Sequence, residues 1–172
     1  FVNKVLEMIE LSIIFNIDVY KIDFLLSREA FIHSLIIYRS STISINAFKN
    51  DMLIPLLEPL CIPNKLKLKS YKFNSIFNLT NFKLESYRDN RFKIIKHIPF
   101  IKSFNQSGHI NFMLLNNIAH RLYINKKLNY DNIPNFIINN VKKETNNKKF
   151  NSFNSILKYI RVKSNRYEQN FF

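Results

Sequence analysis

The sequence has 172 residues, which is enough for one domain or for a small domain with an appendage. Hydrophobic residues make up 47% of it, yet it contains only one Gly. A single Gly excludes Gly-rich phosphate loops, so these residues hold neither a dinucleotide-binding motif nor a P-loop. The net charge of +14 is typical of proteins with an anionic partner. The many Asn, Lys, Ile, Phe and Tyr residues are also what A/T-rich codons produce, and we favour that cause.

Cysteine content and hydropathy bear on the compartment. Cys61 is the only cysteine, so no internal disulfide can form and a reducing compartment fits. No apolar run approaches the roughly 20 residues that a membrane helix needs, and no signal peptide is visible. We therefore expect no membrane partner. The first residue is Phe1 rather than Met, which indicates either a processed start or a fragment.

The first third of the chain predicts one helix followed by short strands. Apolar residues recur at helical spacing over residues 2–15. Residues 22–26 predict a short strand, and the β-branched stretches 31–38 and 42–48 predict an antiparallel hairpin. Asp51 is a candidate cap for a short helix. These elements indicate an α+β arrangement of a helix with short antiparallel strands.

The rest of the chain predicts a linker and then a small helical bundle. Residues 66–97 are basic, rich in Asn and weakly periodic, which is typical of a linker. Beyond them, several short amphipathic helices are expected. Their predicted landmarks are Pro99 at a helix start, Gly108 at a break, residues 111–124 as a helix with Tyr123 inward, Asp131 as a cap, and a last helix from Phe153.

The sharpest chemical pattern lies in the first predicted helix. Asn3, Glu7 and Glu10 fall at i, i+4 and i+7, with Lys4 beside them. An amide beside an ammonium can hold a phosphate or a hydroxyl through charge-assisted hydrogen bonds. A carboxylate one turn further can bind a hard divalent cation, although one carboxylate needs further ligands from elsewhere. On spacing alone, a solvated helix face with a Lys–Glu pair is the preferred interpretation.

Other candidate residues indicate less. The four histidines lack ligand spacing with Cys or with one another, so zinc is not expected. Cys61 has no sequence context of a nucleophile. Two basic stretches, one of them followed by aromatic residues, would suit nucleic acid, although a solvated surface is the preferred interpretation. They are Lys65, Lys67 and Lys69, followed by Tyr71 and Phe73, and in the tail Lys158, Arg161, Lys163 and Arg166.

Several blocks, in order and at matching spacing, resemble the 1-deoxy-D-xylulose 5-phosphate reductoisomerases. Residues 3–10 (NKVLEMIE) are similar to the family's Asn-Lys-Gly-Leu-Glu-x-Ile-Glu helix. Residues 32–35 (IHSL) resemble its Ile/Val-His-Ser-Leu/Met strand, and residues 51–55 (DMLIP) its Asp-Met-Arg-x-Pro. Residues 99–102 (PFIK) resemble Pro-Cys-Leu/Ile-Lys, and residues 115–119 (LNNIA) resemble Leu-Asn-x-x-Asn-Glu-x-Ala. The resemblance covers residues 1 to about 143.

The resemblance implies the C-terminal portion of an enzyme that is usually a homodimer. Residues 1–65 would be the end of the catalytic domain, 66–97 a linker, and 98–172 the C-terminal helical domain. The family rearranges and reduces 1-deoxy-D-xylulose 5-phosphate to 2-C-methyl-D-erythritol 4-phosphate with NADPH. The resemblance implies that Asn3 and Lys4 bind this substrate and that Glu7 is a ligand of Mg²⁺ or Mn²⁺. Glu10 matches an acidic position near the metal.

The sequence departs from the family pattern at several positions. The NADPH domain and an Asp-x-Glu pair that completes the metal site precede the matched region, so we expect this chain alone to be inactive. Val5 replaces a Gly and would crowd the site. Residues 27–30 (SREA) replace His-Pro-Gln-Ser, and Leu53 replaces an Arg. Asn117 or Ile118 replaces the Glu of the Asn-Glu pair.

The sequence supports two hypotheses about function, one enzymatic and one non-catalytic. The first is a piece of an NADPH- and metal-dependent reductoisomerase from the cytoplasm of a bacterium or endosymbiont, or from a plastid. The second is a basic non-catalytic protein from an A/T-rich genome, either RNA-binding or structural. The first predicts a companion sequence with a Gly-rich cofactor loop, and the second predicts steeply salt-dependent RNA binding.

Overall fold

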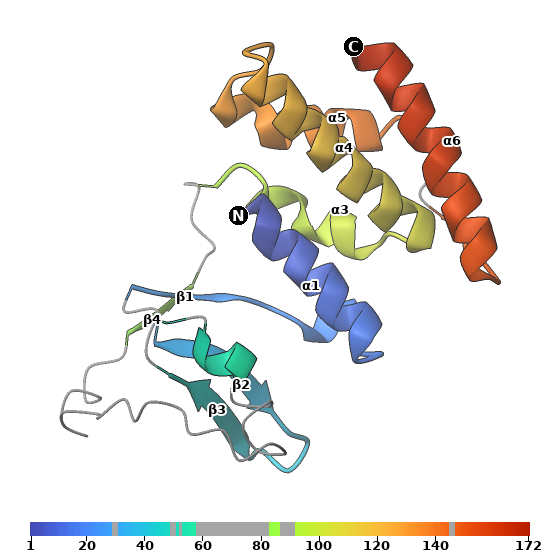
Figure 1. The fold of residues 1–172 in the computed structure, drawn as a ribbon. Coiled ribbons are helices and arrows are strands. Elements are labelled where there is room, and N and C mark those ends of the chain that lie inside the picture. Colours follow the sequence, from blue (N-terminus) through green and yellow to red (C-terminus); the bar gives the residue numbers. More distant parts are fainter. Residues whose placement is uncertain (29–30, 49–50, 52, 58–82, 87–91, 145–146) are drawn as a thin grey trace. The chain divides into compact units, whose positions relative to one another are not determined.

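The computed structural model shows two compact units (Figure 1). One unit comprises residues 1–23 with 88–172, and the other comprises residues 24–87. The described residues are 1–28, 31–48, 51, 53–57, 83–86, 92–144 and 147–172. Helices and short antiparallel strands confirm the predicted α+β class. The boundaries of these units differ from those of the predicted ranges 1–65, 66–97 and 98–172. The assignment of those ranges to parts of an enzyme stays a prediction.

The first helix, α1, spans Val2–Ile14 and confirms the predicted helix. Its apolar face buries Val5, Met8 and Ile9, which follow helical spacing. The helix ends at Phe15, and Asn16 then has a positive φ of 50°, a conformation that Asn tolerates better than most residues. The buried face fixes which way the polar side chains of α1 point.

The second unit is built from two antiparallel strand pairs. Strand β1 (Leu25–Ser27) pairs with β4 (Leu84–Ser86), and β2 (Ile32–Ile37) pairs with β3 (Ile43–Ala47). The β2–β3 pair confirms the predicted hairpin. Its turn is closed by the backbone N–H of Tyr38, which donates to the carbonyl of Thr42 at 2.9 Å.

Only part of the predicted helix after Asp51 lies within the described residues. Residues 53–57 are helical, and Asp51 Oδ1 accepts a hydrogen bond from the Leu53 backbone N–H at 3.0 Å, as a cap does. The continuation of that helix, Cys61 and the Lys65–Lys69 stretch lie outside the described residues. Strand β4 falls within the predicted linker.

The larger unit is a bundle of helices beside α1. Its further elements are the 3₁₀ turns η1 (Val19–Lys21), η3 (Ile95–His97) and η4 (Tyr130–Asn132), and the helices α3 (Ile98–Lys102), α4 (Gln106–Ile124), α5 (Ile133–Val141) and α6 (Phe153–Phe171). Helices α5 and α6 both pack against α4 (Figure 1). None of these helices, within the described residues, is both long and apolar enough to cross a membrane.

The core of this unit is formed by α1, α3, α4 and α5, with one residue of α6. Its fully or nearly fully buried apolar side chains include Ile94, just before η3, and Val5, Met8, Ile98, Ile101, Phe112, Leu115, Ile118, Ala119, Ile137, Ile138, Val141 and Tyr167. One hydrogen bond ties the end of α3 to the segment after α1, since Lys102 Nζ donates to the Ile22 carbonyl at 2.7 Å. Helix α1 therefore belongs to the same packed body as the C-terminal helices.

The N-terminus of α4 differs from the prediction. Gly108 was expected to break the helix, but it lies buried inside α4, which begins at Gln106. A distant segment bonds to the first turn: the Ser107 N–H donates to the Lys148 carbonyl at 3.1 Å, and the Lys148 N–H donates to Ser107 Oγ at 2.9 Å. The Phe150 N–H donates to Gln106 Oε1 at 2.7 Å. This long-range partner satisfies helix-end groups that a local cap usually serves.

Two other predictions for this unit were wrong. Asp131 does not cap α5, because it lies within η4 and the N-cap position belongs to Asn132. Tyr123 does not point inward, since 44% of it is exposed. Its ring instead packs edge-on against Tyr130, with 5.9 Å between centroids. In the same helix Leu122 is buried, so the buried face of α4 includes Leu122 but not Tyr123.

An ion pair joins the end of α5 to the middle of α6. The Glu144 carboxylate binds Lys163 Nζ, and the two side chains are only 9% and 13% exposed. Arg166 lies 3.8 Å from the same carboxylate. The hydroxyl of Tyr167 is buried beside the same carboxylate. Burial, followed by the charge of Glu144, raises the pKa of Tyr167.

We expect Glu144→Gln to lower the free energy of unfolding by about 3 kcal/mol, because it leaves a largely buried ammonium without its counter-charge. Urea unfolding followed by circular dichroism measures this. The matched control is Glu168→Gln, which breaks the half-exposed pair with Arg121 and should cost less than about 1 kcal/mol. Equal losses in the two variants would contradict the distinction between the pairs.

Candidate substrate and metal site

The three residues proposed for substrate and metal share the exposed side of α1. Asn3 and Lys4 are exposed, and Glu7 is partly exposed, with 42% of its side chain accessible. The buried face of the helix carries Val5 and Met8 instead. The amphipathic pattern of α1 therefore fixes both the burial of one face and the outward direction of the other.

Hydrogen bonds organise these side chains into one cluster. Asn3 Nδ2 donates to Glu7 Oε1 at 3.0 Å, and Lys4 Nζ donates to Glu7 Oε2 at 2.7 Å. The spacings are i, i+4 and i, i+3, the separations at which helical side chains meet. Each oxygen of the carboxylate therefore has a donor. Glu10, one turn further along, is exposed.

This cluster suits an anionic or oxygen-rich ligand. An ammonium and an amide lie within one helical turn, and both can turn from Glu7 to a phosphate or a hydroxyl. The Glu7 carboxylate is an appropriate ligand type for Mg²⁺, but one carboxylate does not make a site. No group of three His, Cys, Asp or Glu residues that could hold a metal occurs in the described part of the chain. Glu7 fits a metal as one ligand of a set completed by other groups.

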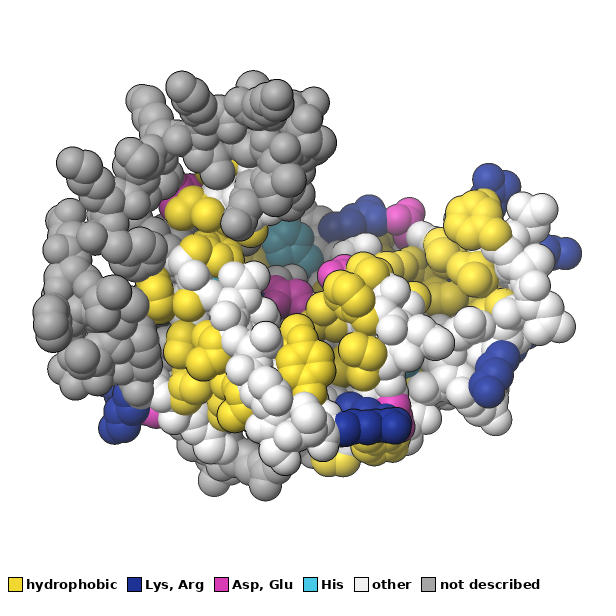
Figure 2. Space-filling model, turned by 90° about the horizontal axis from the view of Figure 1, so that it is seen from below, with side chains coloured by type: hydrophobic (Ala, Val, Ile, Leu, Met, Phe, Trp, Pro, Cys, Tyr) yellow, Lys and Arg dark blue, Asp and Glu magenta, His cyan; other side chains and the backbone are white. Residues whose placement is uncertain are grey.

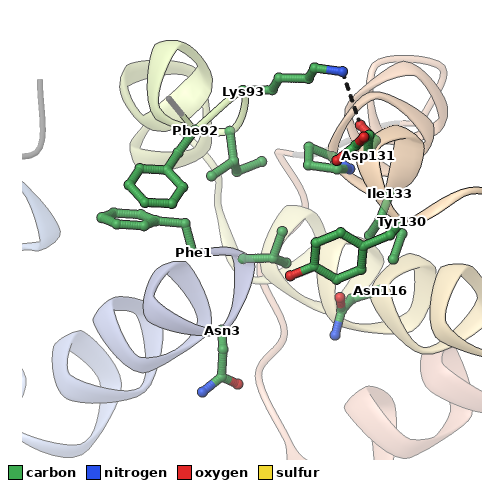
Figure 3. Close-up of a pocket in the computed structure, with 11 residues that line it drawn as sticks. Phe1, Asn3, Phe92, Lys93, Asn116, Tyr130, Asp131 and Ile133 are labelled. Carbon is green, nitrogen blue, oxygen red and sulfur yellow. Dashed lines mark hydrogen bonds between the residues drawn. The ribbon is translucent and has the colours of Figure 1, made fainter. Parts of the chain in front are cut away.

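A cavity of about 310 Å³ adjoins the start of α1 (Figure 3). The rings of Phe1 and Phe92 pack against each other on one side of it, with centroids 4.4 Å apart. At the rim, Lys93 Nζ donates to the Asp131 carbonyl at 3.2 Å. The lining residues are Phe1, Val2, Asn3, Phe92, Lys93, Ile94, Asn116, Tyr130, Asp131, Ile133 and Pro134. Asn3 thus belongs both to the cavity wall and to the cluster around Glu7.

The sequence did not predict this cavity. Its wall is drawn from α1, from residues 92–94, from α4 and from the η4–α5 junction. No local pattern marks residues that only the fold brings together. Asn3 and Asn116 were the available signals, because each belongs to a block that resembles the family.

Two histidines of the helical unit, His97 and His109, have lowered pKa values. Burial lowers the pKa of His109, while a hydrogen bond with the backbone of Ile101 acts in the opposite direction. Burial, followed by the charges of Lys142 and Lys96, lowers the pKa of His97. Both imidazoles therefore favour the neutral form. His33, in the other unit, stacks on a Phe ring.

The residues present do not fit NADPH. The single glycine, Gly108, is buried within α4 rather than placed in a loop between a strand and a helix. The known dinucleotide fingerprint needs several glycines at such a turn. We therefore derive no chemistry through NADPH from these 172 residues.

Comparisons with curated proteins point to one kind of enzyme. No protein-family model matches the chain. The 1-deoxy-D-xylulose 5-phosphate reductoisomerase of Pelagibacter ubique is 25% identical over 154 residues, or 90% of this chain and 38% of that protein. The apicoplastic enzyme of Plasmodium falciparum is 30% identical over 143 residues, or 78% and 28%. The enzyme of Pseudothermotoga lettingae is 30% identical over 145 residues, or 84% and 39%.

This chain is a relative of the 1-deoxy-D-xylulose 5-phosphate reductoisomerases. It spans between 28% and 39% of the length of the three relatives just named. Solved reductoisomerases share its fold. A complex with NADPH, fosmidomycin and magnesium has a TM-score of 0.82 at 19% identity, covering 98% of this chain and 42% of that one. The Zymomonas mobilis enzyme with NADPH has a TM-score of 0.79 at 20% identity, covering 99% and 44%.

The residues that depart from the reductoisomerase pattern are found in both units. Val5 was expected to crowd the site, but its side chain is fully buried in the helical unit, away from the exposed cluster. Arg28, in the stretch that replaces His-Pro-Gln-Ser, lies 3.7 Å from the Glu85 carboxylate. Leu53 is 58% exposed. Of the two candidates for the position of the family's Glu, Asn117 is exposed and Ile118 is buried.

We expect Val5→Ala to lower the free energy of unfolding by about 2 kcal/mol, because it removes two buried methyl groups and leaves a small cavity. Glu7→Gln should change the same quantity by less than about 0.5 kcal/mol, because the side chain is partly exposed. Urea denaturation measures both. A larger loss for Glu7→Gln than for Val5→Ala would mean that the cluster is structural.

Proposed function

We propose that residues 1–172 supply the substrate- and metal-binding helix and the C-terminal helical part of a 1-deoxy-D-xylulose 5-phosphate reductoisomerase. The observation that carries this proposal is the Asn3–Lys4–Glu7 cluster. It lies on the exposed face of a helix whose other face is locked into a core. The similarity of the chain to reductoisomerases over most of its length supports the same assignment.

In the proposed reaction each side chain has a definite part. Lys4 and Asn3 bind the phosphate side and a hydroxyl of 1-deoxy-D-xylulose 5-phosphate through charge-assisted hydrogen bonds. Glu7 holds Mg²⁺ or Mn²⁺ together with carboxylates from outside the described residues. The bound cation supplies polarisation of the substrate's carbonyl. The product is 2-C-methyl-D-erythritol 4-phosphate.

The present hydrogen bonds of Glu7 set a condition for metal binding. Both carboxylate oxygens accept a donor in this structure. Each oxygen keeps a second lone pair that can bind a cation. The charge of a bound cation would repel the Lys4 ammonium from Glu7, and Lys4 would then turn to the substrate. Metal and substrate binding at this helix are thus proposed to be linked, because Lys4 serves either Glu7 or the substrate.

These residues alone are proposed to be inactive. They carry no Gly-rich loop, and the described residues offer one carboxylate where a metal needs several. NADPH would be bound by another part of the enzyme. The relatives include bacterial proteins and an apicoplastic one. A bacterial or endosymbiont cytoplasm, or a plastid, is the compartment that we propose.

A homodimer is the proposed assembly, and the second unit offers a surface for it. The two-stranded β2–β3 sheet leaves several large apolar side chains in solvent. They are Ile36, Ile37, Tyr38, Ile43 and Ile45, each between 49% and 70% exposed. By strand alternation and register, Ile37, Ile43 and Ile45 fall on one face of this sheet. An exposed apolar patch of this kind is typical of an association surface. The opposing pair Ile37–Ile43 lies at the end of the ladder.

The proposed site is tested in a chimera. The corresponding part of the Pseudothermotoga lettingae enzyme is replaced by residues 1–172, and NADPH oxidation with 1-deoxy-D-xylulose 5-phosphate is followed at 340 nm with Mg²⁺. We expect Glu7→Gln to lower kcat/KM by at least a hundredfold, since it removes a metal ligand from the reacting centre.

The control for this experiment is Glu168→Gln, which removes a half-exposed carboxylate of α6 that takes no part in the cluster on α1. It should retain activity within about tenfold. Residues 1–172 alone should neither oxidise NADPH nor change its fluorescence. Equal activity of the Glu7→Gln and unchanged chimeras would refute the metal role of Glu7. An inactive but folded unchanged chimera would count against the proposed function itself.

The proposed dimer is tested by sedimentation velocity. We expect residues 1–172 to sediment as a dimer at about 50 µM. Ile37→Lys should shift the protein to the monomer, because it places a charge on the apolar patch. The control is Ile13→Lys, at a residue of α1 that is 65% exposed and distant in sequence from the hairpin. A monomer in all three proteins would contradict this assembly for residues 1–172.

A further inference from the structure

The positive charge of the chain is concentrated in its C-terminal half. Residues 88–172 hold sixteen of the 26 Lys and Arg residues but only four of the 12 Asp and Glu residues, so they carry a net charge of +12 out of +14. Codon bias towards Lys and Asn would act on the whole chain. A charge gathered in one stretch therefore needs a separate explanation.

The few carboxylates of this stretch neutralise only some of its cations. Glu144 pairs with Lys163 and lies 3.8 Å from Arg166, and Glu168 pairs with Arg121. None of the ion pairs among the described residues includes the cations at the end of α5, in residues 147–152, or on the outer face of α6. These unpaired cations are Lys142, Lys143, Lys148, Lys149, Lys158 and Arg161.

We call these six side chains the basic surface. All six are exposed. The segment that carries Lys148 is bonded to the first turn of α4 through Ser107, and Glu144 ties the end of α5 to α6. The right-hand end of Figure 2, which is the side of α6 in Figure 1, shows several Lys and Arg side chains without an Asp or Glu among them. The surface is thus built on connected, packed elements.

Aromatic rings hold some of these cations in place without neutralising them. Lys148 Nζ lies 5.4 Å from the centroid of the Phe150 ring and 5.8 Å from that of Tyr159. Lys142 Nζ lies 5.9 Å from the Phe100 centroid. The Tyr159 hydroxyl donates to the buried Asn111 Oδ1 at 3.1 Å, which fixes this ring. Cation–π contacts of this kind position an ammonium and leave its charge available to an anion.

We propose that the basic surface binds single-stranded RNA, independently of the reductoisomerase site. The cations come from a helix end, a loop and a second helix, so a ligand that contacts all of them must pass over three segments. A flexible polyanion can follow such a path, and phosphate neutralisation by Lys and Arg supplies the affinity. The half-buried rings of Phe150 and Tyr159 lie beside the path.

An anionic membrane surface is the other polyanion to consider. Membrane-surface helices combine a basic face with an apolar face that enters the lipid. In α6 the apolar positions Ile156, Leu157 and Ile160 are half-buried, and the helix packs on α4. The exposed apolar side chains of α6 before its C-terminal residue, Phe153 and Val162, lie on opposite sides of the helix. Helix α6 thus has no continuous exposed apolar face that could enter lipid, which favours RNA.

The test is fluorescence anisotropy of a 5′-labelled 20-nucleotide oligouridylate with residues 1–172. We expect binding at 50 mM salt that weakens roughly a hundredfold at 200 mM, as about five phosphate contacts would produce. A variant with Lys142→Gln, Lys149→Gln and Lys158→Gln should bind at least tenfold more weakly at 100 mM. Its slope of log affinity against log salt should fall by about 2.

The matched control removes the same charge from exposed positions elsewhere, through Lys21→Gln, Arg39→Gln and Lys126→Gln. It should bind within threefold of the unchanged chain, and circular dichroism should show that both variants are folded. Equal weakening in the two variants would overturn the surface and leave only a net-charge effect. Absence of binding at 50 mM salt, or binding to vesicles with 30% anionic lipid but not to RNA, would also overturn the proposal.

Discussion

The burial of one face of α1 is the constraint on which the rest of the structure depends. Val5, Met8 and Ile9 leave water when this helix packs with the C-terminal helices. At roughly 1.5–3 kcal/mol for each fully buried side chain of this size, the contact fixes the rotation of the helix about its own axis. Because side chains three and four residues apart share a face, that rotation also fixes where Asn3 and Glu7 point.

The same constraint gives a physical reason for the change from Gly to Val after the lysine of the family motif. At this position a side chain reaches the core rather than the ligand, so a larger apolar residue adds buried surface and a better helix former. The substitution that was expected to crowd the site therefore places its side chain in the core instead. Arg28 and Leu53, which also depart from the family pattern, lie in the other unit, where Leu53 is exposed.

Much of the architecture was predictable because it depends on local patterns. Helix α1 and the β2–β3 hairpin follow from apolar spacing and from a turn between β-branched stretches. The start of α4 was not predictable, since Lys148 and Phe150 bond to its first turn from about forty residues away. The cavity beside Asn3 escaped prediction for the same reason. The cluster of Asn3, Lys4 and Glu7 was predictable, because all its spacings fall within two turns of one helix.

The charged side chains of residues 88–172 fall into two groups, one paired inside the helical unit and one exposed to solvent. Among the described residues of this stretch, Glu144 is a largely buried carboxylate that pairs with Lys163, whose ammonium would be costly to bury unpaired. The remaining ammonium groups stay in solvent, and rings rather than carboxylates hold some of them. Repulsion among these cations opposes compact packing. An anionic partner would relieve that repulsion, so any polyanion that binds the basic surface should also stabilise the helical unit by mass action.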